Sequence, residues 1–419
     1  MKRGKAASLD GLTAEHLLNC HPVIVSILVK LFNLMLLCCY VPDSFGVGLC
    51  IPLLKHGSNV QSVDGYRGIT VSPVISKIFE YSVCSKLDKY FCTSDLQFGF
   101  KKKMSCSHAI YSLRTTVDHF VNGGSTVNLC AMDLSKAFDR VNHYCLFVKL
   151  LKRGIPRQFV LLFECWYCKT FIHVRWQDAI SDRVRLKSGV RQGGVLSPIF
   201  FILYVDDLIL QLQSQNMGCH IRGLFLGAIM YADDLILLSA SVVELQLMVS
   251  LCQVELDNID MIINTSKTVC MRIGPKFNVQ CCNITLNNNQ LLWVTVLRYL
   301  GVFVQSCKIF RLSFYDARKR FYIAANSIFS KVGKDNIAVV LSLVSSFCTP
   351  LFLYGSETVY LNKTERSKLN NPCNIIYNKL FNTYNKSVLR NCQYFCGYLP
   401  FDLLHDFNVI FVFITICLS

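Results

Sequence analysis

The sequence lacks long runs of any single kind of residue. Its longest purely basic run is three residues, Lys101-Lys102-Lys103, and we find no internal repeat and no low-complexity segment. These absences exclude a basic tail and a repeat array. Yet 43 Lys and Arg residues stand against 27 Asp and Glu residues, a formal net charge of +16. Because this excess is dispersed, it indicates a basic groove that binds a polyanion.

The sequence also lacks an uninterrupted apolar run of about 20 residues, the length that a membrane-spanning helix needs. Residues 23–40 come near, but Ser26, Lys30 and Asn33 interrupt them, so we interpret the segment as a buried amphipathic helix. The apolar residues 409–418 are too few to span a bilayer. We therefore expect no membrane contact, and a location in the cytoplasm and nucleus.

Cysteine is abundant, but the signals that would give it a special role are missing. No secretory signal precedes the 22 cysteines, so buried reduced thiols are favoured over a disulfide framework. Cys165 and Cys168 have the spacing of a zinc-binding pair. No clear second Cys/His pair follows at finger spacing, so we predict no zinc site.

Two adjacent acids, Asp233 and Asp234, lie inside a strongly apolar stretch. Apolar residues 227–230 precede Tyr231-Ala232-Asp233-Asp234, and apolar residues 235–238 follow. Short apolar runs around an acidic turn predict a β-hairpin with both acids at its tip. Burying such charges costs several kcal/mol per ion unless a partner compensates, and carboxylate oxygens suit magnesium. The alternative is an Asp-Asp turn that caps its own backbone amides.

A third acid of the same kind lies 100 residues upstream. The apolar residues 127–132 predict a strand that ends at Asp133, and residues 134–139 then turn toward a helix. An acid at a strand end together with acids at a hairpin tip is what a two-metal phosphoryl-transfer site requires. One ion would activate the attacking hydroxyl, and the other would neutralise the triphosphate.

A second Tyr-x-Asp-Asp sequence competes for this role. Tyr204-Val205-Asp206-Asp207 directly follows the apolar residues 199–203, which we interpret as part of a helix. Helical spacing would turn Asp206 and Asp207 away from a hairpin tip. We therefore predict that the later pair, Asp233 and Asp234, carries the chemistry.

Eight segments in this order resemble the reverse transcriptase domain of LINE-type (non-LTR) retrotransposons. The resemblance extends over residues 5–305 and rests on residues 5–12, 51–55 with 64–69, 97–100, 133–139, 189–198, 231–234, 264–268 and 299–301. Any one segment is weak evidence, but the shared order makes chance agreement very unlikely as an explanation.

The resemblance implies an α+β fold of the right-hand polymerase type, with an antiparallel palm sheet backed by helices. It assigns residues 1–126 to the fingers and an N-terminal extension, and residues 127–275 to the palm. Residues 276–305 would form the primer-grip hairpin. Residues 306–419 would form a helical thumb, whose completeness the sequence leaves open.

The resemblance also implies a role for each candidate site residue. Asp133 and Asp233 would hold two Mg²⁺ ions, and Asp234 would support the charge of the hairpin and ligate weakly. The expected nucleotide-binding residues are Lys55 and Arg67 on the triphosphate, Phe138 under the incoming sugar, Gln192 beside the base pair and Lys267 at the leaving pyrophosphate. The alternatives are a core aromatic for Phe138, an ordinary turn for Gln192 and solvated charges for the three cations.

The function implied is an RNA-directed DNA polymerase that extends a primer 3′-hydroxyl with dNTPs. Its expected partners are an RNA template, a DNA primer or target and the dNTPs, while the oligomeric state stays open. Two alternatives remain. One is a related intron- or telomere-type reverse transcriptase, and the other is a catalytically silent nucleic-acid-binding protein on the same scaffold.

Overall fold

The computed structural model describes residues 3–55, 57 and 59–418, and the chain divides into two compact units. The first unit comprises Met1–Phe100, Leu134–Ser214 and Leu251–Asn264. The second comprises Lys101–Asp133, Gln215–Ser250 and Thr265–Ser419. The chain therefore crosses between the units several times, and each unit is described by itself.

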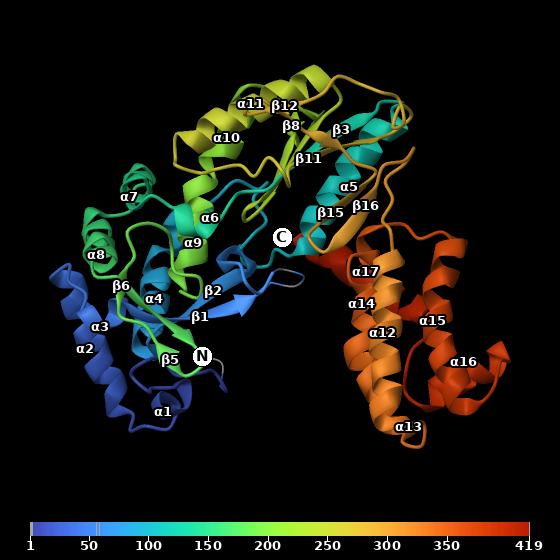
Figure 1. The fold of residues 1–419 in the computed structure, drawn as a ribbon, viewed down its shortest axis with the longest axis horizontal. Helices are drawn as coiled ribbons and strands as arrows, with labels where there is room; N and C mark the ends of the chain where they lie inside the picture. Colours follow the sequence, from blue (N-terminus) through green and yellow to red (C-terminus); the bar gives the residue numbers. More distant parts are fainter. Residues whose placement is uncertain (1–2, 56, 58, 419) are drawn as a thin grey trace. The chain divides into compact units, whose positions relative to one another are not determined.

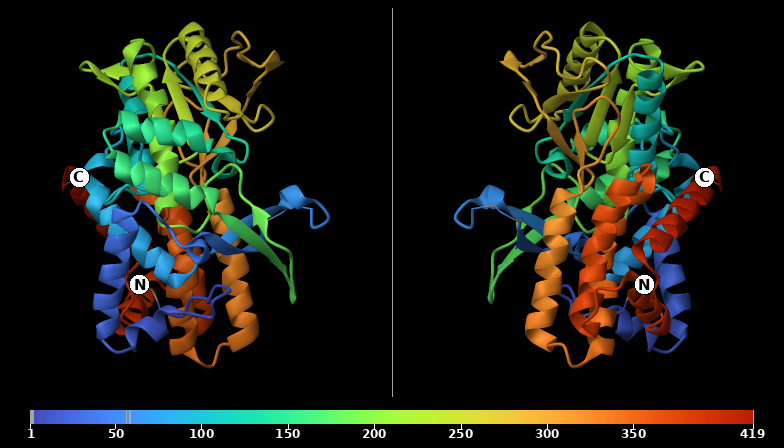
Figure 2. Two further views of the ribbon diagram at one scale, coloured as in Figure 1. Left: turned by 90° about the vertical axis from the view of Figure 1, so that its left-hand side faces the viewer. Right: turned by 90° about the vertical axis from the view of Figure 1, so that its right-hand side faces the viewer.

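The first unit is built on a mixed sheet with the strand order β2-β1-β4-β5, in which β6 also pairs with β4 (Figure 1). β1 and β2 form an antiparallel hairpin, and β1 pairs with β4 in parallel. The hairpins β1–β2 and β4–β5 thus lie side by side, as Figure 2 shows. The strands are β1 (Val47–Leu54), β2 (Tyr66–Val71), β4 (Phe171–Trp176), β5 (Ala179–Ile180) and β6 (Val184–Arg185).

Helices surround an aromatic core in this unit. The ring of Phe79 lies 5.6 Å from that of Trp166, and the ring of Phe163 lies 4.9 Å from that of Phe200. These residues come from α4, α8 and α9, whose buried faces meet there. The helices are α1 (Ala14–Leu18), α2 (Val23–Leu37), α3 (Asp43–Gly46), α4 (Val74–Leu87), α6 (Ala137–Arg140), α7 (His143–Lys152), α8 (Arg157–Cys168), α9 (Leu196–Val205) and α10 (Asp207–Ser214).

Helix α2 corrects one expectation from the sequence. The segment is helical as predicted, but only Phe32 and Met35 are buried, whereas Val25 is 61% and Leu37 75% exposed. Apolar residues occur on all sides of this helix, and a neighbouring element can cover only one stripe of it. The interpretation of residues 23–40 as a buried helix was therefore wrong about burial.

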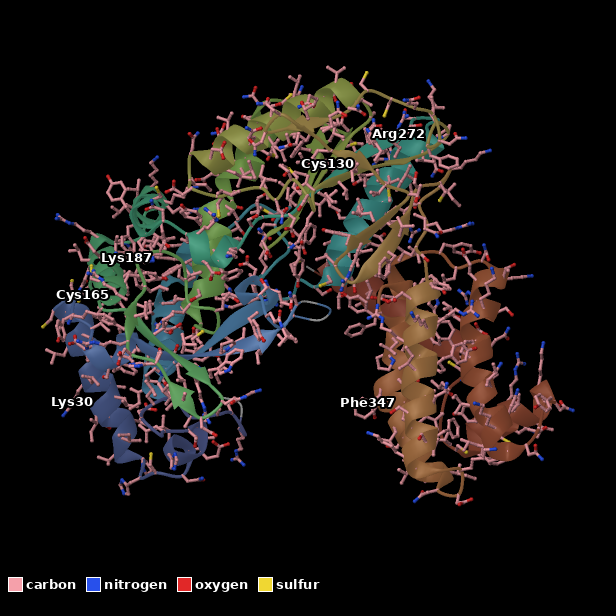
Figure 3. The ribbon with its side chains drawn as sticks, viewed as in Figure 1. Lys30, Cys130, Cys165, Lys187, Arg272 and Phe347 are labelled. Atoms are coloured by element: carbon pink, nitrogen blue, oxygen red, sulfur yellow. The ribbon has the colours of Figure 1, made fainter. Side chains whose placement is uncertain are left out.

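The second unit contains the sheet that positions the acids. Its strand order is β14-β11-β3-β10-β9, antiparallel except for the parallel pair β11 and β14. β3 is central, and Leu129 and Cys130 on opposite faces of it are fully buried (Cys130 is labelled in Figure 3). Helix α5 (Cys106–Asn122) packs against β3 and β9. The strands are β3 (Val127–Met132), β9 (Ala228–Tyr231), β10 (Asp234–Ser239), β11 (Val269–Ile273) and β14 (Leu292–Trp293).

Short hairpins surround this sheet, and α11 (Val242–Asp257) runs from the second unit into the first. One hairpin pairs β15 (Val296–Tyr299) with β16 (Val302–Gln305). The others pair β7 (His220–Ile221) with β8 (Leu224–Phe225), and β12 (Thr285–Leu286) with β13 (Asn289–Gln290).

The rest of the second unit is mainly helical, as predicted for residues 306–419. Its core includes Phe321 stacked on Phe352 with ring centroids 4.5 Å apart, and Phe401 at the edge of Phe352. Phe347, labelled in Figure 3, is 64% exposed on a π-helical turn, Val344–Cys348. The helices are α12 (Tyr315–Val332), α13 (Ile337–Leu343), α14 (Thr349–Leu353), α15 (Lys363–Phe381), α16 (Lys386–Phe395) and α17 (Phe401–Leu418).

Two helical stretches within the described part of the chain are long and apolar enough to cross a membrane by length and composition. Leu196–Ser214, which is α9 with α10, is 67% buried and belongs to the core of the first unit. Ile337–Thr358 is 28% buried. One or two such helices are weak evidence for a membrane span, so the expected absence of membrane contact stays a prediction.

The fold is thus a mixed α/β fold, with an antiparallel sheet at the acids except for its one parallel edge strand. The division into fingers, palm, primer grip and thumb stays a prediction.

Candidate active site

The hairpin β9–β10 carries Asp233 at its tip, as predicted, but Asp234 is the first residue of β10 and does not belong to the turn. Asp234 pairs with Tyr231, so Ala232 and Asp233 alone form the turn. Two short apolar runs on either side of the turn favour the hairpin. Their residues Ile229, Met230, Leu235 and Ile236 are all buried, with at most 1% exposure. Ala232 has a φ of 58°, a left-handed conformation that is unfavourable for any residue with a Cβ.

The strand β3 brings Asp133 beside this tip. Leu235 of β10 pairs with Met132 of β3 in an antiparallel register, so the next position along the ladder sets Asp133 opposite Asp234. The backbone amide of Asp133 also donates a hydrogen bond to the hydroxyl of Thr268, at 3.3 Å. Acids separated by 100 residues therefore gather at one edge of the sheet.

The three carboxylates repel one another, and two cations partly balance them. Surrounding protein atoms exclude water from Asp234, and Asp233 and Asp133 add negative charge, so its pKa rises to about 6, although Arg298 opposes the shift. Lys267 Nζ lies 3.6 Å from Asp133 Oδ2, in a pair whose side chains are 68% and 36% exposed. The edge thus carries three acids against two solvent-accessible cations, an excess that attracts a divalent cation.

The acids fit a divalent cation whose coordination is completed by substrate. Within the described residues, no group of three or more His, Cys, Asp or Glu side chains is arranged to hold an ion by itself. Mg²⁺ is usually bound through one or two carboxylates, with waters and substrate phosphates filling the other positions. Asp133 and Asp233 would be the protein ligands, and their negative charge adds to burial in raising the pKa of the neighbouring Asp234.

The competing Tyr204–Asp207 sequence is structural. It lies at the junction of α9 and α10, which confirms the helical interpretation. The side chain of Asp206 is 3% exposed, and its carboxylate accepts from the Ser94 amide at 2.8 Å and from Arg153 Nη2 at 2.7 Å. The hydroxyl of the fully buried Tyr204 donates to the Ile259 carbonyl at 2.7 Å. These side chains hold the first unit together.

Gln192 lies in a loop tied to the β1–β2 hairpin in the first unit. Its carbonyl accepts from the Thr70 amide at 2.7 Å, and its Nε2 donates to Asp139 Oδ1 at 3.3 Å. Gly193 has a φ of 123°, and a Cβ there would lie 2.3 Å from the Thr70 carbonyl oxygen. Glycine is therefore required for this approach.

Glu80 supports the same loop, and the sequence analysis missed it. Its side chain is 2% exposed, and its Oε2 accepts hydrogen bonds from the amides of Val195 and Leu196 at the start of α9. Arg191 Nη2 lies 3.7 Å from its Oε1. The only signal was an acid inside the apolar pattern of α4, since its partners lie more than 100 residues away.

Phe138 and the two cations Lys55 and Arg67 also belong to the first unit. The half-buried Phe138 ring stacks on Phe201 with centroids 4.5 Å apart and planes 14° apart. Lys55 follows β1, and its Nζ donates to the Asp64 carbonyl at 2.9 Å. Arg67 on β2 is exposed and pairs with Leu53. The structure thus places Lys55, Arg67, Phe138 and Gln192 in one unit, and the three acids with Lys267 in the other.

With this geometry in view, the family of the chain can be decided. Residues 53–304 match the family described as reverse transcriptase (RNA-dependent DNA polymerase), which covers more than half of the chain. The chain belongs to the reverse transcriptase family. The resemblance inferred from the order of the eight motifs is therefore confirmed.

Relatives of this reverse transcriptase chain include polymerases of mobile elements. It is 26% identical over 297 residues to the RNA-directed DNA polymerase from mobile element jockey of Drosophila funebris, covering 68% of this chain and 31% of that protein. It is 25% identical over 267 residues to the Pol polyprotein of the retrotransposable element R2DM of Drosophila melanogaster, covering 64% and 25%. The matched part is thus a third or less of either relative's length.

Solved telomerase structures also resemble the chain. The apo telomerase from Candida tropicalis matches with a TM-score of 0.46 and 12% identity, covering 83% of this chain and 68% of that chain.

Proposed function

We propose that this chain is the RNA-directed DNA polymerase part of a non-LTR retrotransposon protein. It would extend a primer 3′-hydroxyl by in-line attack on a dNTP, copy an RNA template and release pyrophosphate. The observation that carries the proposal is the meeting of Asp133 with Asp233 and Asp234 at one sheet edge. Family membership and the relatives named above support it.

Two metal ions and several side chains would share the proposed chemistry. Two Mg²⁺ ions at Asp133 and Asp233 would supply activation of the hydroxyl and neutralisation of the triphosphate. Lys267, exposed and 3.6 Å from Asp133, would contact or protonate the leaving pyrophosphate. Asp234 would support the local negative charge that holds the ions.

The first unit would position the nucleotide. Lys55 and Arg67 would clamp the triphosphate, Arg67 through its planar fork and Lys55 as a point charge. Phe138, fixed by its stack on Phe201, would fill the space of a ribose 2′-hydroxyl. Gln192 would contact the base pair from a loop that is already held by Thr70. We further propose that residues 1–126 act as the fingers, 127–275 as the palm, 276–305 as the primer grip and 306–419 as the thumb.

The test is primer extension on poly(rA)/oligo(dT) with dTTP and Mg²⁺, comparing the wild type with Asp233→Asn. We expect the variant to lose about 10³-fold in rate, because a lost metal ligand removes several kcal/mol of transition-state stabilisation. Asp335→Asn, a change of the same kind at an exposed loop position, should extend normally. Equal extension by wild type and Asp233→Asn would refute the site.

The same assay separates the silent alternative. Absence of extension by the wild type, with RNA binding retained, would favour the catalytically silent binding protein. Mg²⁺ omission should abolish extension by the wild type without abolishing its binding to RNA.

A further inference from the structure

The turn that joins β15 to β16, both labelled in Figure 1, is strained. Tyr299 pairs with Val302, so Leu300 and Gly301 alone form the turn. Both have a positive φ, 43° at Leu300 and 81° at Gly301. Glycine adopts this left-handed conformation freely, whereas a bulky residue such as leucine adopts it only at a cost in free energy. Such a conformation persists where the surrounding structure enforces it, so we expect a contact from outside the hairpin.

Tyr354 supplies this contact. Its hydroxyl donates a hydrogen bond to the Leu300 carbonyl at 2.6 Å. A Cβ on Gly301 would lie 3.1 Å from Cε1 of the Tyr354 ring, so the ring itself lies against the turn. The next residue, Gly355, has a φ of 77°, and a Cβ there would clash with Val302 Cγ1. Glycine at this position therefore lets the two segments approach closely enough for Tyr354 to reach the turn.

The chain that follows Tyr354 is anchored on helix α5. The Ser107 hydroxyl of α5 donates a hydrogen bond to Glu357 Oε1 at 2.6 Å. Arg114 Nη1, also of α5, donates to the Thr358 carbonyl at 2.8 Å. Because α5 packs against β9, Tyr354 links the turn between β15 and β16 to an element that supports the acid-bearing hairpin.

The hairpin of β15 and β16 lies beside the acids. Arg298 on β15 is exposed, and its positive charge acts on Asp234. The next residue, Tyr299, is buried, and burial together with the negative charge of Asp234 raises its pKa. β15 also contacts β11, which pairs with the strand β3 that ends before Asp133. The position of this hairpin therefore decides which groups lie next to the acids.

We propose that Tyr354 is a positioning residue, which holds the β15–β16 turn in its strained form so that the hairpin places the primer 3′-end at the acids. The inference rests on the proposed function for the identity of the primer, whereas the hold on the turn rests on the contacts alone. The proposed dNTP contacts come mainly from the first unit. Loss of the Tyr354 hydroxyl should therefore slow the chemical step without weakening dNTP binding.

The first experiment compares the full wild-type chain with Tyr354→Phe, which removes only the hydroxyl. In primer extension on poly(rA)/oligo(dT) with Mg²⁺, we expect kcat to fall about 10-fold, because a small misplacement of a reacting group slows the reaction. The KM for dTTP should stay within about twofold of wild type. Tyr360→Phe makes the same change at a nearby position that is 80% exposed, and should match the wild type. Equal kcat in the wild type and Tyr354→Phe would overturn the proposal, as would an equal loss in Tyr360→Phe.

A second variant tests whether the hold acts through the strain at Leu300. Asparagine adopts the left-handed conformation more readily than leucine, so Leu300→Asn should make the turn less dependent on Tyr354. The double variant Leu300→Asn, Tyr354→Phe should therefore recover most of the kcat that Tyr354→Phe loses. A double variant as slow as Tyr354→Phe would overturn the proposed role of the turn.

Hydrogen exchange separates this inference from the proposed function. Residues 296–305 comprise both strands and the turn. Without substrate or Mg²⁺, Tyr354→Phe should raise amide exchange in this segment about 10-fold and leave exchange in β3 unchanged. Unchanged exchange in residues 296–305 would overturn the inference. Faster exchange in the variant, with no primer extension by the wild type, would count against the proposed function and leave the hold on the turn standing.

Discussion

Removal of Arg153 is expected to destabilise the first unit severely. Arg153 Nη2 lies 2.7 Å from Asp206 Oδ2, and the Asp206 side chain is 3% exposed. In Arg153→Leu this carboxylate would stay buried with the Ser94 amide as its remaining described partner. Breaking a buried ion pair from one side costs about 3–5 kcal/mol, because the remaining charge is uncompensated. We expect a loss of that size in the free energy of unfolding.

Three further variants test whether the uncompensated buried charge causes the loss of stability. Asp206→Leu leaves Arg153 bonded to the Cys92 carbonyl at 2.7 Å and near Asp207 at 3.4 Å, so its cost should be smaller, about 1–3 kcal/mol. The double variant with leucine at both positions should recover much of the loss, because apolar replacements of a buried pair are often nearly neutral. Arg157→Leu, at an exposed position, should stay within about 0.5 kcal/mol of wild type.

The assay is urea unfolding followed by tryptophan fluorescence. Trp166 is 2% exposed in the core of the first unit and reports its loss of packing. A cost below about 1 kcal/mol for Arg153→Leu, or a double variant as unstable as the single one, would refute the argument. Folded Asp206→Asn should also extend primers normally, in contrast to Asp233→Asn, since the earlier Tyr-x-Asp-Asp sequence is structural.

Two further changes test local features of the second unit. Burial raises the pKa of Glu357, whose Oε2 is buried without a hydrogen-bond partner among the described atoms. A carboxyl whose pKa is raised in the folded state loses stabilisation as the pH rises. The melting temperature of Glu357→Gln should therefore rise relative to that of the wild type between pH 4.5 and 8. A difference in melting temperature that stays constant with pH would contradict this. Ala232→Gly should stabilise the protein by about 0.5–1 kcal/mol, since glycine adopts a φ of 58° freely, and a lower melting temperature would contradict it.

The elements around the acids could be predicted because their signals are local. The hairpin at Asp233 needs only two short apolar runs and a turn, and adjacent strands pair with each other most easily. The strand ending at Asp133 is apolar except for the hydrogen-bonded Asn128, because it is central in its sheet and buried on both faces. The distinction from Tyr204–Asp207 was likewise a matter of local helical spacing.

Features that depend on distant partners could not be predicted. The carboxylate of Asp206 meets Arg153 from 53 residues away, and Glu80 meets the start of α9 from 116 residues away. The composition of α2 predicted a helix, but it does not say how much of that helix a neighbour covers. The roles of the site residues stay predictions, because those roles depend on bound substrate. The boundaries of the predicted domains also stay predictions.

The crowding of acids at the hairpin tip has a consequence for how such a gene decays. Replacing Asp233 or Asp234 by a neutral residue removes repulsion from the folded chain while abolishing or weakening the proposed chemistry. Selection for a stable product and selection for an active one therefore act in opposite directions at these codons. Loss of either acid is therefore expected to leave a folded chain without the proposed chemistry.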